Sequence, residues 1–537
     1  MWNGLAGERS HVPRTVAVIL ASLLAFAPAT AQAAWMRAES RHYIVYGEGD
    51  AATVRDKAER LEKLNLLQHA LAGTADAPPA IKLRVYLLDS AERVRATMPF
   101  PGAFVSGYYG ATVRGPYAVT TASDDKLAHF PAQLVLFHEL THYFMSQASS
   151  AAYPVWYSEG VADFVGTTAI DGNVVTLGAP VDNRYFSLRG RRGEDWIAIG
   201  KLLGAHDYAA VGDRIDLLYA EGWLLTHYLT LGGTRPGQLA RYLSAINAGQ
   251  SYAQAAQVFG DLGQLNHELK VYAERNKLPV KVITFKPIDH GSITVAPVSP
   301  AQAALMTADI RIDAGIPAAD ADRFATAVRK IASAYPDDPW ALRIRVEADW
   351  LAEERDDRGA ALARWAALAP RDPAMLHHRA LLALDTLVAD KVTAPARWDA
   401  VRGDLLAAIR LAPNDPAILR SYHDSYRMQG IEPTPGAQNG LFRALDLVPQ
   451  DAEVRYALAA GFERRGLYKD ALAVIAPAAY EVDEGKPGGH DDDAAATKAR
   501  ARFRMARQPL HETARTMLVR LQKEAGTPAG GEPPPRG

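Results

Sequence analysis

Apolar and polar residues alternate with two different periods along the first part of the chain. Period-two alternation predicts strands at residues 41–46 and 81–88, and the Tyr-, Val- and Gly-rich residues 107–121 predict one or two more. Residues 51–72 have helical periodicity. A second helix is expected to begin near Pro131, because proline suits the first helical turn. Strand, helix, strand, strand, helix is an α+β pattern with a small mixed sheet.

The pattern continues with a hairpin and a group of helices. Residues 168–177 contain Asp171-Gly172, a dipeptide typical of a two-residue hairpin turn. Residues 195–277 have helical periodicity. Prolines then interrupt the short extended runs of residues 278–300, and we expect the first domain to end there.

The second half of the chain repeats a short punctuation between amphipathic segments. The copies are Tyr335–Pro339, Ala369–Pro373, Ala412–Pro416 and Val448–Asp451, at spacings of 34, 43 and 36 residues. A period near 34 is typical of helix-turn-helix repeats. The last unit, with Tyr456, Gly466 and Tyr468, resembles the tetratricopeptide pattern of small residues between paired helices. We expect an all-α, tetratricopeptide-like repeat domain, with a plain helical bundle as the alternative.

The N-terminus has the features of a secretory signal. Residues 16–29 form an apolar stretch that is too short to span a bilayer comfortably, and Ala31-Gln32-Ala33 gives the small-x-small pattern that signal peptidases cut. An uncleaved anchor is the alternative, which Pro28 disfavours. We therefore expect an exported bacterial protein, periplasmic or secreted, without a stable membrane span after cleavage. The expected segments are a signal peptide (1–33), the α+β domain (34–280), a linker (281–300), the repeats (301–480), a loop with C-terminal helices (481–525) and a disordered tail (526–537).

Composition excludes several classes of function. The 537 residues carry a formal net charge of −2, which gives no reason to expect a nucleic-acid partner. Cysteine is absent, so disulfides and thiolate metal sites are excluded. Any transition metal would need imidazole and carboxylate ligands.

The pentapeptide His138-Glu139-Leu140-Thr141-His142 supplies such ligands. Histidines four residues apart project from one face of a helix, so both can reach one zinc ion. Glu139 lies beside the metal, where it can take a proton from bound water. The alternative is a pair of core histidines. It is disfavoured because this helix is apolar on most faces, and burying two unpaired histidines and a glutamate there would be costly without a metal.

A catalytic zinc site also needs a third protein ligand and one open position. Glu159, seventeen residues after His142, can be that ligand. Asp163 is four residues further along the same helix face, where it can accept the free N–H of a ligating histidine. A solvated acidic face is the alternative, and the neighbouring Trp156 and Phe164 favour a buried helix instead.

The HExxH motif followed by E-x-x-x-D on a second helix resembles the gluzincin metallopeptidases, the thermolysin-like and aminopeptidase-N-like group. Glu159-Gly160-Val161-Ala162 also looks like the peptidase-MA-like exported bacterial proteins that carry tetratricopeptide repeats. The resemblance covers roughly residues 35–235. It implies a gluzincin-type peptidase domain with Zn²⁺ as its cofactor.

A third segment, Tyr219–Leu229, resembles the aminopeptidase-N-like sequence Y-E-K-G followed by an apolar helix. In that family the leading tyrosine donates a hydrogen bond to the developing oxyanion, a role that falls here on Tyr219. A phenol near zinc can stabilise a tetrahedral intermediate without adding charge. Two alternatives stay open. Tyr219, Trp223 and His227 could form a core stripe, or His227 could be the donor, as a histidine is in thermolysin-like enzymes.

The sequence departs from the aminopeptidases on the strand before the motif helix. Those enzymes carry G-x-M-E-N there, and its glutamate grips the substrate amine, whereas the residues near Gly115–Val119 include no acid. Recognition of a free N-terminus is therefore unsupported. The strand could still pair with an extended substrate backbone, as sheet edges do.

Together these features predict zinc-dependent hydrolysis of peptide bonds, with Glu139 activating water and Tyr219 stabilising the oxyanion. The substrate would be a peptide or protein, and the repeats would bind a protein partner or the substrate. The alternative is a catalytically silent scaffold or assembly protein that acts through its repeats. The intact Glu139 favours the enzyme, since a structural site would not require it. A zinc hydrolase acting on cell-wall peptide or another non-protein amide is a third reading.

Overall fold

The computed structural model describes ten stretches of the chain. These are residues 35–99, 105–122, 131–148, 153–180, 182–190, 195–205, 208–248, 250–285, 292–480 and 514–525. The expected signal peptide, most of the loop expected after residue 480 and the expected C-terminal tail lie outside them. Among the helices in these stretches, none has the length and apolar character that crossing a membrane requires.

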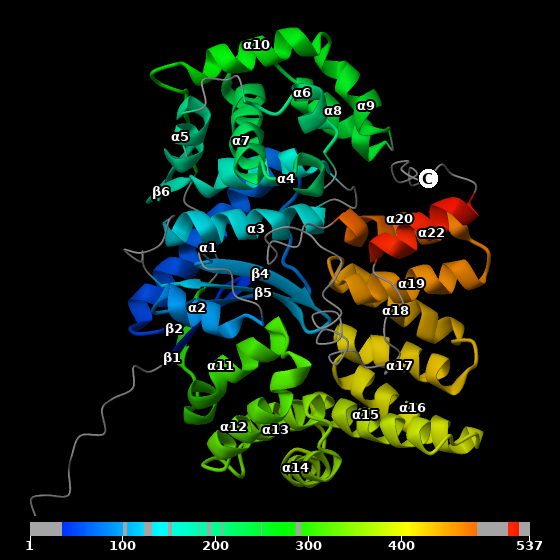
Figure 1. The fold of residues 1–537 in the computed structure, drawn as a ribbon. Helices are drawn as coiled ribbons and strands as arrows, with labels where there is room; N and C mark the ends of the chain where they lie inside the picture. Colours follow the sequence, from blue (N-terminus) through cyan, green and yellow to red (C-terminus); the bar gives the residue numbers. More distant parts are fainter. Residues whose placement is uncertain are drawn as a thin grey trace, which may run out of the picture.

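A six-stranded mixed sheet lies at the centre of the first half of the chain (Figure 1). In spatial order its strands are β4 (Gly107–Thr112), β5 (Gly115–Thr121), β3 (Leu83–Leu88), β2 (Tyr43–Glu48), β1 (Trp35–Glu39) and β9 (Thr294–Pro297). The β2–β3 and β3–β5 pairs are parallel, and the other pairs are antiparallel. The predicted strands are thus present, and β1, at the start of the first described stretch, was not predicted.

Alternating side chains divide this sheet into two faces. Val85, Leu87 and Ala118 belong to one core cluster with α1 (Ala51–Ala72) and α3 (Ala132–Ala148). Tyr86 and Val119 belong to a second cluster with α2 (Ala91–Thr97) and α11 (Pro300–Ala314). Successive residues of a strand point to opposite faces, so both faces of the sheet are covered by helices.

The remaining elements of the first half pack beyond α3 (Figure 1). The helices are α4 (Val155–Gly166), α5 (Asp182–Gly190), α6 (Ile199–Leu203), α7 (Ile215–Leu231), α8 (Gln238–Asn247), α9 (Tyr252–Ala255) and α10 (Leu262–Ala273), with short 3-10 turns η1 (Tyr208–Val211) and η2 (Ala256–Phe259). The predicted hairpin is formed by β6 (Ala169–Asp171) and β7 (Val174–Leu177), and Gly172 adopts a φ of +54° at its turn.

Residues 281–300 are not the simple linker that their prolines suggested. β8 (Lys281–Thr284) pairs with β7, and β9 pairs with β1. The prolines lie outside these short strands or at the end of one of them, and both strands are at sheet edges, where a missing N–H donor is tolerated. The boundary region is therefore built into the sheets of the first half.

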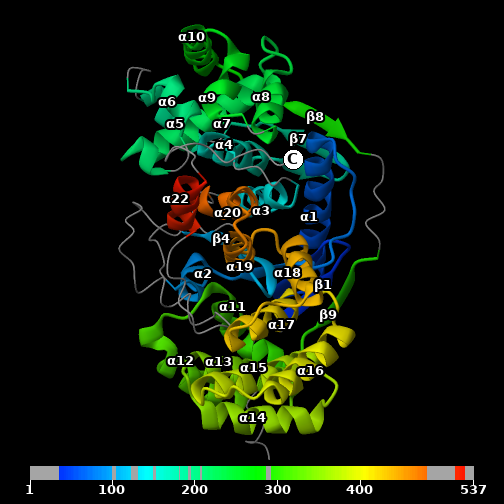
Figure 2. The ribbon, with the colours of Figure 1, turned by 90° about the vertical axis from the view of Figure 1, so that its right-hand side faces the viewer.

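The second half is an array of helices, stacked as Figures 1 and 2 show. The array begins with α11 and continues with η3 (Ala318–Asp320), α12 (Ala321–Ala332), α13 (Pro339–Leu351), α14 (Arg355–Leu368), α15 (Pro373–Ala389), α16 (Pro395–Leu411), α17 (Pro416–Gln429), α18 (Pro435–Leu447), α19 (Ala452–Arg464), α20 (Tyr468–Tyr480) and α22 (Ala514–Glu524). The repeated punctuation marks helix starts. Each helix that follows a copy of the punctuation is capped by an aspartate, which accepts a hydrogen bond from a backbone N–H of the first turn. The caps of α13, α15, α17 and α19 are, in that order, Asp338, Asp372, Asp415 and Asp451.

The helical array is fastened to the β4–β5 turn by buried ion pairs. Arg114, at this turn, places its guanidinium 2.6 Å from Asp309 and 3.0 Å from Asp313, both on α11. Arg84 on β3 lies 2.7 Å from the other carboxylate oxygen of Asp313. Val113, also at the turn, packs in the core cluster of the later helices. The two halves of the chain therefore share both polar and apolar contacts.

Candidate metal centre

The candidate site begins with a close crossing of α4 and α7. A Cβ atom added to Gly160 on α4 would lie 2.2 Å from the carbonyl oxygen of Gly222 on α7, and one added to Gly222 would lie 2.4 Å from the carbonyl oxygen of Trp156. Only glycine lets the two backbones approach so closely. The crossing brings Glu159, next to Gly160, near the residue Tyr219 one turn before Gly222.

Three predicted ligands converge between α3 and α4. The Nε2 atoms of His138 and His142 lie 3.1 Å apart, and Oε2 of Glu159 lies 3.3 Å from the first and 3.5 Å from the second. Glu159 and His138 are buried, and His142 is partly buried. Within the described part of the chain, this is the group of histidine and acidic side chains that could hold a metal ion.

The tautomer of His138 gives this convergence a chemical meaning. Its Nδ1 atom lies 2.9 Å from Oδ1 of Asp163, and an ionised carboxylate can only accept, so the ring proton is on Nδ1. In the neutral imidazole, Nε2 then carries a lone pair that faces Oε2 of Glu159. Two acceptors at this separation repel one another unless a proton or a metal cation lies between them. The donor set therefore suits a cation.

Asp163 is itself held by a cation. Arg184 on α5 donates through Nε to Oδ2 of Asp163 at 2.8 Å. Burial by itself raises the pKa of the Asp163 carboxyl, but Arg184 and the hydrogen bond from His138 outweigh it and hold that pKa below its ordinary value. Asp163 thus stays ionised and keeps His138 in the orientation described above.

Tyr219 lies beside the three converging side chains. Its ring is stacked near that of His138, with 6.3 Å between centroids, and the guanidinium carbon of Arg184 is 4.3 Å from the centre of the Tyr219 ring. Its hydroxyl is 2.6 Å from the hydroxyl of Tyr208, which donates to Oε1 of Glu159 at 3.0 Å. A phenol is therefore present at the edge of the cluster.

His227 occupies a different environment. It is fully buried, its Nδ1 atom lies 2.9 Å from the Tyr272 hydroxyl, and its Nε2 atom lies 2.9 Å from the carbonyl oxygen of Gly178. Burial lowers the pKa of its imidazole, so the ring is neutral. These contacts are those of a core histidine. They agree with the alternative in which His227 belongs to a stripe of core side chains, and they leave it no free ring nitrogen for an oxyanion.

The strand that precedes the motif helix cannot pair with a substrate as the sequence suggested. β5 is hydrogen-bonded to β3 on one side and to β4 on the other, so its backbone groups are already used. The edge strand of the sheet on this side is β4. Glu139, the predicted base, follows His138 on α3 and is buried.

Tyr208 and Arg184 are the two site residues that the sequence did not predict. Tyr208 belongs to the short turn η1, and Arg184 belongs to the nine-residue helix α5. Neither segment has a periodic pattern that would point to the site, and the contacts of both residues depend on tertiary packing. The weak signal available was chemical: a phenol and a cation within about 70 residues of the motif.

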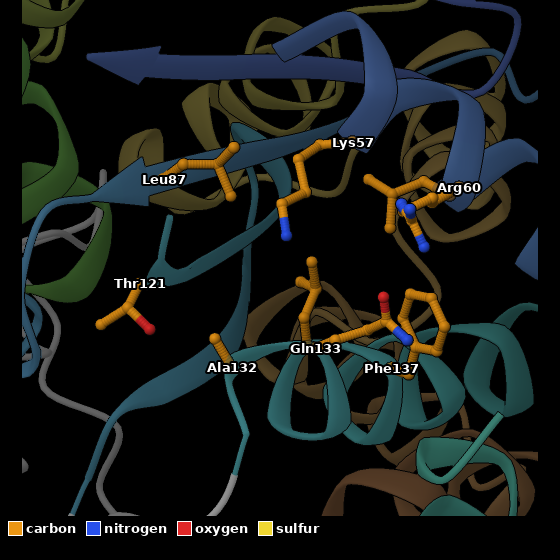
Figure 3. A pocket seen from close by; sticks show the side chains of 9 residues that line it. Lys57, Arg60, Leu87, Thr121, Ala132, Gln133 and Phe137 are labelled. Carbon is orange, nitrogen blue, oxygen red and sulfur yellow. The ribbon is translucent and has the colours of Figure 1, made fainter. Parts of the chain in front are cut away.

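A small cavity near the start of α3 is separate from these residues (Figure 3). Lys57 and Arg60 of α1 reach toward it from one side, and Ala132, Gln133 and Phe137 of α3 line the other. Its volume is about 10 Å³, close to what a single water molecule requires. It therefore has no room for a substrate.

Comparison of the chain with protein-family models finds no match, and comparison with curated proteins finds none either.

Proposed function

We propose that this protein is a zinc-dependent peptidase of the gluzincin type. The observation that carries the proposal is the triangle formed by Nε2 of His138, Nε2 of His142 and Oε2 of Glu159, with sides of 3.1, 3.3 and 3.5 Å. Tetrahedral zinc with ligand bonds of about 2.0–2.2 Å requires its ligand atoms to be about 3.3–3.6 Å apart. The donor types fit that ion. Two of the three separations lie in this range, and the 3.1 Å separation of the two histidine nitrogens is slightly below it.

The surrounding residues suit the hydrolysis of an amide. A zinc ion held here would supply a Lewis acid that polarises water and the substrate carbonyl. Glu139 accepts the proton of the attacking water, a role for which its position after His138 on the helix is suited. Tyr219 donates a hydrogen bond to the oxyanion. Asp163 fixes the tautomer of His138.

We also propose that the later helices form tetratricopeptide-like repeats and that the protein is exported. The paired helices and their recurring Asp caps support tetratricopeptide-like repeats after the peptidase domain. The leader at residues 1–33 supports export to the periplasm or beyond. The repeats act on a protein partner or on the substrate, through faces other than the one fastened to Arg114.

The test compares wild-type protein with Glu139→Gln, and uses Glu92→Gln, at an exposed glutamate of α2, as the matched control. Metal analysis should find one zinc per chain in all three proteins. In a peptide-library cleavage assay, wild type and Glu92→Gln should be active and should lose activity with a chelator. Glu139→Gln should lose about 10²–10⁴-fold in turnover, because the ligands remain while the base is gone.

Three outcomes count against the proposal. A wild-type protein that takes up no zinc removes the metal centre. A Glu139→Gln variant as active as wild type removes the mechanism. A zinc-loaded protein that cleaves no peptide in the library favours the silent scaffold, or the hydrolase of a non-protein amide, instead.

A further inference from the structure

A second phenol links the candidate ligand Glu159 to the candidate oxyanion donor Tyr219. We propose that Tyr208 is a positioning residue for both, an inference that rests on the proposed zinc site. Its hydroxyl donates to Oε1 of Glu159 at 3.0 Å and is 2.6 Å from the Tyr219 hydroxyl. The rings of Tyr208 and Tyr219 are stacked, with 6.0 Å between their centroids.

The direction of the two hydrogen bonds follows from counting protons. A phenol has one O–H proton, and an ionised carboxylate has none to give. The proton of Tyr208 is therefore directed to Glu159. In the 2.6 Å contact between the two hydroxyls, Tyr219 must then be the donor and Tyr208 the acceptor. The result is a directed chain from Tyr219 through Tyr208 to Oε1 of Glu159.

This chain determines how Glu159 meets a metal ion. Oε2 faces the Nε2 atoms of both histidines, while Oε1 is engaged by Tyr208. Glu159 therefore presents one oxygen to the metal and has its other oxygen held by a neutral donor. Hydrogen bonds of this kind orient a ligating carboxylate, and their loss costs about 10–100-fold in metal affinity.

The chain also sets the resting state of Tyr219. Its proton is directed to the Tyr208 hydroxyl. To donate to an oxyanion, the Tyr219 hydroxyl must turn about its C–O bond and exchange Tyr208 for the substrate oxygen. Arg184 stacks on the Tyr219 ring, so the ring stays in place while the proton changes direction.

The decisive measurement is zinc affinity, by competition with a chromophoric chelator, in the full-length protein. Tyr208→Phe removes one oxygen and should weaken zinc binding by about 10–100-fold. Tyr153→Phe, whose hydroxyl bonds Asn247 outside the site, is the matched control and should bind zinc as wild type does. Thermal unfolding of each variant checks that it is folded.

A double-mutant cycle separates positioning from a general structural effect. In a Glu159→Gln background the acceptor is a neutral amide oxygen, so the loss caused by Tyr208→Phe should shrink to less than about threefold. A loss that stays as large in that background would overturn the inference, and so would a Tyr208→Phe variant with wild-type affinity. Wild-type protein that binds zinc without cleaving peptides would end the proposed activity and leave this comparison intact. Wild-type protein that binds no zinc would end both.

Discussion

The crossing of α4 and α7 makes Gly160→Ala a severe test of how the site is built. The new Cβ atom would lie 2.2 Å from the carbonyl oxygen of Gly222, and ordinary contact begins at 3.4 Å, so the helices must separate by about 1 Å. Overpacking of this kind costs about 1–3 kcal/mol, and the upper end applies here because the contact is with backbone, which cannot rotate away. For a domain of the size expected for residues 34–280, a loss of about 2–3 kcal/mol in the free energy of unfolding corresponds to a fall in Tm of roughly 4–12 °C.

The same separation should weaken the metal centre. Glu159 is adjacent to Gly160, and ligand sets lose affinity when a member moves by more than about 0.5 Å. We expect zinc affinity to fall at least tenfold, measured by chelator competition beside differential scanning fluorimetry. Gly403→Ala in α16 is the control, since its Cβ would meet no atom within 4 Å and alanine favours a helix. A Gly160→Ala variant with the Tm and zinc affinity of wild type would refute the close crossing.

Four further predictions concern single side chains. Asp163→Asn should lower zinc affinity about 10–100-fold in the same competition assay, and equal affinity would remove its role in orienting His138. Tyr219→Phe should lower turnover and leave Tm nearly unchanged; an unaltered rate would move the oxyanion role elsewhere. Arg114→Met should cost up to about 3–5 kcal/mol, because Asp309 and Asp313 would each lose one of two buried cationic partners and keep only Arg343 and Arg84. This should be seen as a lower denaturation midpoint, and an unchanged midpoint would contradict the ion-pair cluster. Burial raises the pKa of Glu221 from 4.5 to about 8, although Ile197 donates a hydrogen bond to its carboxyl. The folded state therefore favours the protonated carboxyl of Glu221. The contribution of this group to the free energy of unfolding is complete below about pH 4.5 and is lost as the pH rises to about 8. Glu221→Gln should flatten the decline of Tm across that window, and a parallel decline in both proteins would count against it.

The parts of the fold that could be predicted are those set by local rules. The hairpin turn at Gly172 and the helix starts at the recurring Asp residues depend on a few adjacent residues, and both are present. The pairing of β1 with β9 joins residues near 36 and 297. Nothing in either segment specifies its distant partner, so the prolines near β9 indicated a linker instead of an edge strand.

The residues of the candidate site also divide into those placed by local helical spacing and those placed by tertiary packing. The shared faces of His138 with His142, and of Glu159 with Asp163, follow from helical spacing within one element. The approach of Tyr219 depends on the crossing of two helices at Gly160 and Gly222. Both glycines are visible in the sequence, but nothing in the sequence indicates that they lie against each other. Tyr208 and Arg184 come from short segments with no period, so only tertiary structure could place them at the site.

The helical array was the part whose role the sequence described least well, and its contacts change the argument about partners. Charged residues on a repeat helix look like a solvated face, yet Asp309 and Asp313 are buried against Arg114 and Arg84. That face of the array is therefore occupied by the first half of its own chain. The Arg114 turn joins β5 to the edge strand β4, and β4 packs against the motif helix, where Gly107 lies close to Val135. A partner that displaced the array from this turn would act on the edge strand nearest the candidate metal centre, and this would couple the proposed binding by the helices to the proposed hydrolysis.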